Sequence, residues 1–388
     1  MKRVYLDHNA TTPVRAEVLE AMLPYFKEKF GNASSIHEFG REAKVALEES
    51  REKVAALIGA SSNEIFFTGG GTESDNLAVK GTAFANRKKG LHIITSKIEH
   101  HAVLESCKFL EKEGFEITYL PVNPQGVVDP EDLRKALRDD TTLVSIMYAN
   151  NEVGSIQPIE ELAKVAKEKG AYFHTDTVQA AGKIPINVRK LNVDMLSISA
   201  HKIYGPKGVG ALFVRKGVRI TPWSHGGRHE RSRRAGTENV PAIVGLAKAL
   251  ELATNELESQ SEYLRNLTEA FYQRLVQSIP DIIPNCDLRQ RIPNTLNLSF
   301  KGVEGESIIL SLDLKGVAVA SGSACTSGAL EPSHVLSAMG VPPEIAQGAI
   351  RFSFGRDNTM EDVEYVAGIL PEIVQRLRSM SPLYAQKQ

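Results

Sequence analysis

The sequence lacks an excess of charge of either sign. Lys and Arg together number 46 against 47 for Asp and Glu, which leaves a net charge of -1 over 388 residues. A near-neutral chain has no overall field that attracts nucleic acid or an anionic membrane surface. We therefore expect no direct nucleic-acid partner and no membrane partner, and any charged ligand must be bound by local groups.

Cysteine is scarce, and its spacing excludes two common uses. The three cysteines, Cys107, Cys286 and Cys325, lie far apart and form no C-x-x-C pair. This spacing argues against both a disulfide framework and a structural zinc site. A reducing cytoplasm is the location that we expect.

Long hydrophobic runs are also missing. No stretch of about 18 apolar residues occurs, and the start, "MKRVYLDHNATTP", lacks the apolar region of a signal peptide. We therefore expect neither membrane insertion nor export. The G-x-x-x-x-G-K-[ST] phosphate loop is absent too, which disfavours a nucleoside triphosphatase.

The sequence does contain a regular alternation of strands and helices from about residue 50 to 215. Apolar residues recur at intervals of three and four in the longer segments between the strands. Such alternation predicts an α/β fold with a mostly parallel sheet covered by helices, and ligands bind such sheets beyond the carboxyl ends of the strands. The predicted strands are "EIFFT", "HIITS", "EITYLPV", "TLVSIMY", "AYFHTD", "MLSIS" and "GALFVR".

A second, smaller α/β unit follows a long helical stretch at residues 240–280. We expect residues 16–255 to form a large domain. Residues 1–15 and 256–388 would form a small domain that includes a Ser- and Gly-rich loop at about 320–332. No low-complexity linker separates the two units, so we expect them to be rigidly associated.

Two segments offer groups for a phosphate. In "FFTGGGTESDN" the glycines at 69–71 follow a strand and open a helix, so their N–H groups and the Thr72 hydroxyl can contact an anion. The alternative is a plain strand-to-helix turn. In "SISAHKIYGPKG", Ser199 and His201 flank the end of another strand and also suit a phosphate.

Two further residues suit a carbonyl cofactor with a pyridine ring. Lys202 stands at the end of the strand "MLSIS", where a lysine with a lowered pKa can form a Schiff base. Asp176 ends the strand "AYFHTD", and a buried carboxylate there would keep a pyridine nitrogen protonated. The alternatives are a surface lysine and a helix N-cap aspartate, and spacing alone does not separate them.

Together these residues resemble the cysteine desulfurases, which are enzymes of pyridoxal-5'-phosphate fold type I. The likeness to the iron–sulfur housekeeping and nitrogenase-type members with a long cysteine loop runs in order along essentially the whole chain. It rests on the motifs "GGGTESDN", "EHHAV", "YANNEVG", "HTDTVQ", "SAHKIYGPKG", "RRAGTEN" and "SGSACTSGALEPSHVL".

The resemblance implies a role for each residue of the cofactor site. Lys202 matches the Schiff-base lysine that also moves the substrate Cα proton. Asp176 matches the partner of the pyridine nitrogen, and Gln179 matches the residue bonded to the ring hydroxyl. The residues that match the phosphate site are Gly71, Thr72, Ser199 and His201. Thr237 matches a threonine that reaches the phosphate of the other subunit, which implies a homodimer.

The resemblance also assigns the substrate groups. His100 matches the histidine that stacks on the cofactor and handles protons at the thiol. His101 is the alternative by proximity, but the family pattern E-H-x-A-V favours His100. Asn151 and Arg351 match the residues that hold the substrate carboxylate, for which a forked guanidinium is suited.

Cys325 matches the residue that receives sulfur as a persulfide while L-cysteine becomes L-alanine. The Ser and Gly residues around it favour a loop that can carry sulfur to another protein. We expect no metal site, although Cys325 can serve as a transient iron–sulfur ligand. Cys107 and Cys286 are expected to be structural or incidental.

Several alternatives remain at this point. The sulfur acceptor can be an iron–sulfur scaffold, a nitrogenase-type scaffold or a relay for transfer-RNA thiolation. The chain can instead be a selenocysteine lyase, an aminotransferase of the same fold or an inactive scaffold. The arginine-rich segment at 228–234 lacks the aromatic residues of a nucleic-acid site and favours a dimer interface. The role of His8, where relatives often have Asn, is open.

Overall fold

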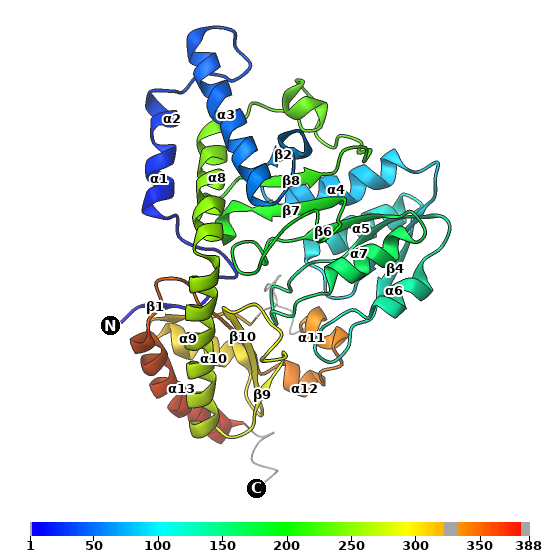
Figure 1. The fold of residues 1–388 in the computed structure, drawn as a ribbon. Coiled ribbons are helices and arrows are strands. Elements are labelled where there is room, and N and C mark those ends of the chain that lie inside the picture. Colours follow the sequence, from blue (N-terminus) through cyan, green and yellow to red (C-terminus); the bar gives the residue numbers. More distant parts are fainter. Residues whose placement is uncertain (1, 322–331, 382–388) are drawn as a thin grey trace.

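The computed structural model describes residues 2–321 and 332–381, and its main feature is a seven-stranded sheet (Figure 1). The strand order is β2-β8-β7-β6-β5-β3-β4. All neighbouring pairs are parallel except those of β8, which runs antiparallel to β2 and to β7. The strands are β2 (Ile65–Thr68), β3 (His92–Ser96), β4 (Glu116–Leu120), β5 (Thr141–Ser145), β6 (Tyr172–Asp176), β7 (Met195–Ser199) and β8 (Gly210–Val214). The predicted α/β class is confirmed.

Both faces of this sheet are covered, because alternate residues of each strand point to opposite sides. In β2, Ile65 and Phe67 join one buried cluster while Phe66 joins another. Helices α4 (Gly71–Ala85) and α5 (His101–Lys112) contribute to the cluster that contains Phe66. The helices of the opposite cluster are α1 (Ala16–Met22), α3 (Glu38–Leu57), α6 (Pro130–Ala136), α7 (Ile159–Lys167) and α8 (Val240–Asn255).

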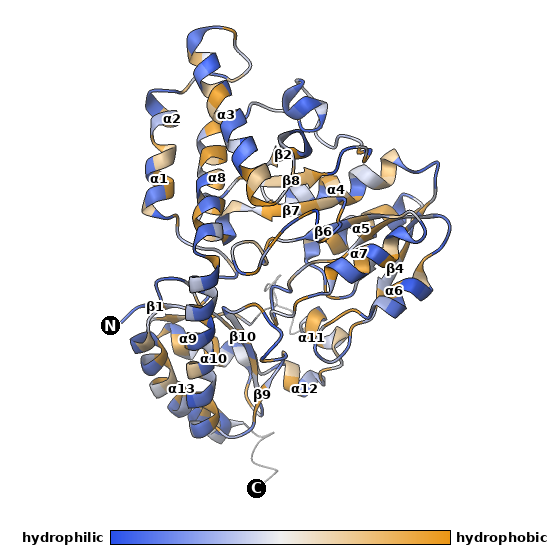
Figure 2. Ribbon diagram, in the orientation of Figure 1, coloured by the Kyte–Doolittle hydropathy of each residue, from blue (hydrophilic) through white to orange (hydrophobic). Residues whose placement is uncertain are grey.

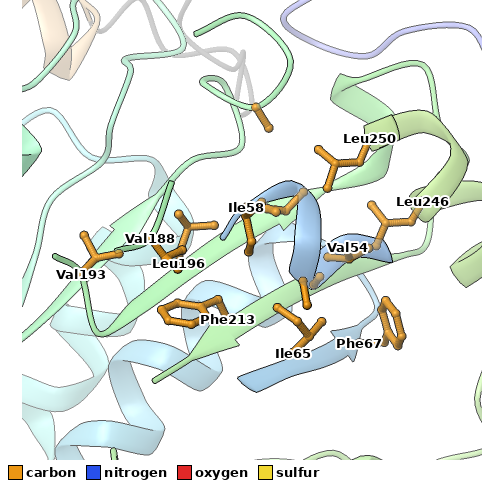
Figure 3. Close-up of a cluster of buried hydrophobic side chains, with 14 of the residues drawn as sticks. Val54, Ile58, Ile65, Phe67, Val188, Val193, Leu196, Phe213, Leu246 and Leu250 are labelled. Carbon is orange, nitrogen blue, oxygen red and sulfur yellow. The ribbon is translucent and has the colours of Figure 1, made fainter. Parts of the chain in front are cut away.

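The larger cluster is built where α3 and α8 pack on the strands (Figure 3). Ile58 follows α3, and Leu246 comes from α8. They lie over Leu196 of β7 and Phe213 of β8, which are fully buried. Burying a side chain of this size stabilises the fold by about 1.5–3 kcal/mol, so this face anchors the strands whose ends carry the predicted site.

The second part of the molecule is a three-stranded antiparallel sheet in the order β12-β10-β9, with helices packed on it. Phe271 packs edge-on against Phe352 and Phe354, with ring centroids 5.0 and 5.5 Å apart. The elements are β9 (Ile282–Pro284), β10 (Thr295–Phe300), β12 (Ala349–Ser353), α9 (Leu257–Ser278), α10 (Gly305–Asp313), α11 (His334–Ala338), α12 (Pro343–Ala346) and α13 (Met360–Met380).

The long helical stretch of residues 240–280 is divided at Glu256 into α8 and α9, which run from one part of the molecule to the other (Figure 1). Most of α8 is hydrophobic, whereas α9 is largely hydrophilic (Figure 2). Residues of α8 belong to the core of the large sheet and residues of α9 to the core of the small one. Because α8 and α9 belong to different cores, we propose that the boundary between the two domains lies between residues 255 and 256.

Smaller elements complete the chain. Strand β11 (Val317–Ala318) is only two residues long and pairs in parallel with β1 (Val4–Tyr5), which is equally short. A further short helix, α2 (Pro24–Lys27), follows α1. Short 3-10 turns occupy Ser62–Glu64, Ala200–Lys202 and His229–Ser232. Within the described residues, no helix is both long enough and apolar enough to cross a membrane.

Candidate active site

One cavity of about 1170 Å³ collects ten of the residues that the sequence singled out. Several of them stand at the carboxyl ends of β6 and β7, where ligands bind in sheets of this kind. Others come from the first turn of α4, from the start of α5 and from β12. The ten residues are Gly71, Thr72, His100, Asn151, Asp176, Gln179, Ser199, His201, Lys202 and Arg351.

Lys202 lies in the 3-10 turn that directly follows β7. Its Nζ donates to the carbonyl oxygen of Asn9 at 2.5 Å and to that of Ala10 at 2.8 Å. Burial and, to a smaller extent, the Arg351 cation lower the pKa of Lys202 to about 8. A large share of this lysine is therefore unprotonated at mildly alkaline pH, as a nucleophilic amine must be.

Asn9 was missed as a site residue, although it lies within the motif "YLDHNATTP". Its side chain is buried, with Nδ2 donating to Thr295 Oγ1 at 2.7 Å and Oδ1 accepting from Asn294 Nδ2 at 3.0 Å. These bonds fix the backbone carbonyl that holds Lys202. An asparagine in a polar loop gives no periodic signal, so only its long-range contacts reveal it.

Asp176 is buried at the end of β6 and lines the cavity. Its Oδ1 accepts from the N–H of Val178 at 2.7 Å. Burial raises the pKa of Asp176 to about 6, while that N–H and Lys202 oppose the rise. No α-helix begins at this point, since turns follow, so the N-cap alternative is wrong.

Asp176 also bears on whether the cavity suits a cofactor with a protonated pyridine ring. Among the described residues, Asp176 has no cation within ion-pair distance. A buried carboxylate without a cation is costly, and a cationic group in the cavity would relieve that cost. The residue therefore fits the nitrogen end of such a ring.

The glycine segment gives a second fit to the same cofactor. A Cβ at Gly71 would lie 2.7 Å from Val178 Cγ2 and 3.4 Å from Ser199 Cβ, so only glycine lets the start of α4 pack this closely against two residues that line the cavity. The 15-residue helix α4 points its N-terminal N–H groups at this place, as a phosphate site requires. One detail differs from the prediction, because Gly69 N–H is already bonded to Glu73 Oε2 at 2.7 Å.

His201 stands beside Lys202, and its Nδ1 lies 3.2 Å from Thr11 Oγ1. Burial lowers the pKa of His201 to about 4, with Lys202 adding to the effect, so the ring is neutral near pH 7. A neutral imidazole offers one N–H to an anion, and Ser199 and Thr72 offer hydroxyls on the same cavity wall.

His100 caps the N-terminus of α5, with its Nδ1 accepting from Ala102 N–H at 3.1 Å. Desolvation lowers its pKa to about 4, so the ring is neutral. Because Nδ1 is an acceptor, the network assigns the single ring proton to Nε2. His101 is absent from the described cavity wall and packs against His334, with ring centroids 4.9 Å apart.

Arg351 extends from β12, and its guanidinium is bound on two sides. One terminal nitrogen donates to Asp7 Oδ1 at 2.6 Å and the other to the Asn151 carbonyl at 3.0 Å. The Nε atom is buried without a partner in the described part of the chain. Asp7, like Asn9, was not singled out from the sequence.

Two predicted residues are not placed in the cavity. Thr237 is exposed and is absent from the described cavity wall. Cys325 lies outside the described residues, although Ala320 and Ser321, which precede that segment, line the cavity. The other two cysteines are not exposed: Cys107 is fully buried, and burial raises the pKa of both Cys107 and Cys286.

The role of His8 is partly answered by its surroundings. The ring is buried 4.9 Å from the Tyr5 ring, and a Cβ at Gly355 would lie within 2.1 Å of it. His8 thus fills a space that Gly355 leaves open. It also lines a small second cavity on which Lys202 borders.

The chain is similar to known proteins over nearly its whole length. Residues 4–366 match the family model "Aminotransferase class-V". The chain is 61% identical over 98% of its length to "Cysteine desulfurase IscS" of Dictyoglomus turgidum, covering 97% of that protein. It is 59% identical to the protein of the same name from Methanosarcina thermophila, over 98% of this chain and 94% of that one.

A solved structure described as a NifS-like protein superposes with a TM-score of 0.92 at 45% identity, covering 97% of this chain and 100% of that one. A NifS-like protein from Rickettsia africae gives a TM-score of 0.86 at 34% identity, over 96% and 100% of the two chains. The family model, the relatives and the structural neighbours agree over nearly the whole sequence. The chain belongs to the class-V aminotransferase family and, within it, to the cysteine desulfurases.

Proposed function

We propose that this protein is a pyridoxal-5'-phosphate-dependent cysteine desulfurase that converts L-cysteine to L-alanine and transfers the sulfur to Cys325. One observation carries the proposal: the same cavity contains Lys202, whose pKa is lowered, and the buried Asp176, which has no cation within ion-pair distance among the described residues. The relatives named cysteine desulfurase, at 59% and 61% identity, support the same reaction.

The residues that line the cavity would each contact a different part of the cofactor. Lys202 would bond its carbonyl carbon and Asp176 would face its ring nitrogen. The phosphate would lie near Gly71, Thr72, Ser199 and His201. When bound, the cofactor supplies an electron sink that weakens the bonds at the substrate Cα and, after proton movement, the Cβ–Sγ bond.

Lys202 would move the proton at the substrate Cα. Its lowered pKa makes the amine a base near the pH of the cell, whereas an ordinary lysine is protonated there. The carbonyls of Asn9 and Ala10 hold Nζ in place, so the base is positioned before the substrate arrives.

His100 would act first as a hydrogen-bond donor. Its Nδ1 is occupied by the Ala102 N–H, so Nε2–H is the atom that can bond the substrate sulfur and stabilise its thiolate. To accept a proton, the ring must become the imidazolium, which its low pKa disfavours. We therefore assign His100 to binding the substrate thiolate through Nε2–H.

Arg351 would bind the substrate carboxylate. Asp7 occupies one side of the guanidinium and the Asn151 carbonyl another, so the substrate must share or displace these contacts. A carboxylate arriving at a buried guanidinium gains a charge-assisted hydrogen bond. Asn151 would help to orient it from the same wall.

Cys325 would receive the sulfur. In balance, L-cysteine and the Cys325 thiol give L-alanine and a Cys325 persulfide, so no external oxidant or reductant is needed. Ser321 lines the cavity and Cys325 is four residues further along the chain, which supports its access. Cys107 is buried and Cys286 half-buried, and the raised pKa of both thiols disfavours both as acceptors.

The persulfide sulfur would go to an iron–sulfur scaffold protein in the cytoplasm. Two alternative acceptors are a nitrogenase-type scaffold and a transfer-RNA thiolation relay. The alternative activity is that of a selenocysteine lyase. The relatives named IscS favour the housekeeping scaffold. Comparing alanine formation from cysteine and from selenocysteine tests the lyase alternative directly.

A homodimer would complete the site, with Thr237 reaching the cofactor phosphate of the partner. Thr237 is exposed on its own chain, which supports a contact elsewhere. Large apolar side chains that a monomer would leave in water also lie in the first forty residues, and a second copy would cover them. These are Leu19, Leu23, Phe26, Phe30, Ile36 and Phe39.

The test is an absorption spectrum of the purified protein before and after L-cysteine is added. We expect a yellow protein whose visible band changes on addition, with alanine accumulating. A protein that cannot bind pyridoxal phosphate, or one that forms no alanine, would refute the proposal. Light scattering on the same sample measures the dimer.

A further inference from the structure

Lys183 is a buried lysine that the mechanism above does not use. It is only 9% exposed, and no carboxylate lies within ion-pair distance of it among the described residues. Burial lowers its pKa to about 7. An unpaired buried amine destabilises a fold, so its presence beside the active site calls for a function.

Within the described residues, the Lys183 side chain makes one hydrogen bond, and its acceptor is a predicted cofactor residue. Nζ donates to Gln179 Oε1 at 2.8 Å, and Lys183 lies four residues after Gln179 in the turns that follow β6. In its ammonium form a lysine has donors only, so the amide group that it contacts must then present its oxygen to it. The orientation of Gln179 is thereby fixed.

The other end of Gln179 leads to the catalytic lysine. Gln179 Nε2 donates to the Asn9 carbonyl at 3.0 Å, and the same carbonyl accepts from Lys202 Nζ at 2.5 Å. The two lysines are thus joined by a continuous set of hydrogen bonds through Gln179 and Asn9. Since Nε2 has two hydrogens, one remains for a ligand in the cavity that Gln179 lines.

Lys183 lines a second cavity. It has a volume of about 50 Å³ and is also lined by His8 and Lys202. Only 6% of His8 is exposed, and its Nδ1 has no hydrogen-bond partner among the described residues. The cavity has room for water, which would solvate the remaining N–H groups of Lys183 and lower the cost of burying it.

We infer that Lys183 is a positioning residue that turns the Gln179 amide so that only N–H faces the cofactor. The inference rests on the proposed function, because it takes pyridoxal phosphate as the ligand. A fixed donor suits the oxygen of the cofactor's ring hydroxyl. Without Lys183 the amide is held only by the Asn9 carbonyl, and an amide that rotates presents its oxygen, which repels that acceptor.

The experiment is a double-mutant cycle on cofactor affinity. Lys183→Met, Gln179→Ala and the double variant are prepared as apoproteins, and pyridoxal phosphate is titrated in. The single tryptophan of the chain, Trp223, lines the cavity, so quenching of its emission reports binding without any measure of activity. Lys190→Met, which removes the same charge from an exposed site, is the control.

We expect Lys183→Met to weaken cofactor binding about tenfold, as the loss of a bond to a charged donor implies. In the Gln179→Ala background the same substitution should change the affinity less than about twofold, because the two residues act as one unit. Lys190→Met should match the unmodified chain. The melting temperature of apo Lys183→Met should not fall, because Met buries no unpaired polar group of its own.

Equal effects of Lys183→Met in both backgrounds, or none in either, would overturn the inference. A melting temperature lowered together with affinity would assign Lys183 a general structural role and also overturn it. If Lys183→Met does not fold, Lys183→Leu, which also removes the donor, replaces it in the same cycle. Failure of the unmodified chain to bind the cofactor would instead refute the proposed function.

Discussion

The lowered pKa of Lys202 makes a quantitative prediction about how fast the apoprotein takes up its cofactor. Only the free amine attacks a carbonyl carbon, so the rate follows the unprotonated fraction. With a pKa of about 8, roughly 9% of Lys202 is free amine at pH 7, against about 0.04% for an unperturbed lysine. Burial and Arg351 together therefore accelerate loading about 200-fold at this pH.

The perturbation that tests the cause is Arg351→Met. Arg351 is the second influence on Lys202 after desolvation, while Asp176 and Asp7 act in the opposite direction. Removing the guanidinium also leaves Asp7 without its ion-pair partner. Both changes favour the ammonium form, so the pKa of Lys202 should rise above 8.

The assay is stopped-flow absorbance at the growing visible band, with pyridoxal phosphate added to apoprotein between pH 6 and 10. The rate should rise about tenfold per pH unit and level off near pH 8, and the variant should level off at a higher pH. Arg228→Met, at an exposed position, should leave the midpoint unchanged. A midpoint near 10 in the unmodified chain, or an unchanged midpoint in Arg351→Met, would refute the reasoning.

Three further predictions concern steric fit, protonation and thiol identity. Gly71→Ala should weaken cofactor binding about tenfold, measured by tryptophan quenching, since the new Cβ meets Val178 at 2.7 Å. The matched variant Gly368→Ala lies in open space on α13, so it should instead raise the free energy of unfolding by about 0.5–1 kcal/mol. Burial raises the pKa of Glu99 to about 8, so its contribution to stability is complete below the unfolded pKa of about 4.3 and is lost as pH rises through 8. Urea unfolding of apo Glu99→Gln should lack this loss, and an equal loss in both proteins would contradict it. Cys107→Ser should release sulfide at an unchanged rate, whereas a loss of release from a folded variant would make that buried thiol part of the reaction.

Much of the fold and part of the site were predictable because their signals are local. The seven strands of the large sheet follow from short apolar runs, and parallel strands bring their carboxyl ends together. This is why Asp176 and Lys202, which end β6 and β7, fall in one cavity. The antiparallel direction of β8 carries no such signal, since its residues are buried on both faces like those of its neighbours.

The residues that sequence reasoning missed act through contacts between distant segments. Asn9 holds Lys202 across 193 positions, and Asp7 pairs with Arg351 across 344. Neither has a periodicity or a spacing that marks it. Lys183 escaped notice for another reason: only the structure reveals that it is buried and lacks a carboxylate partner.

The most direct test of the central claim is to locate the sulfur. The protein loaded with pyridoxal phosphate is mixed with L-cysteine, the thiols are alkylated, and peptides are analysed by mass spectrometry. The account predicts one additional sulfur atom on the peptide that contains Cys325, together with one alanine formed per sulfur transferred. Additional sulfur on Cys107 or Cys286, or alanine formed with Cys325 unmodified, would contradict it.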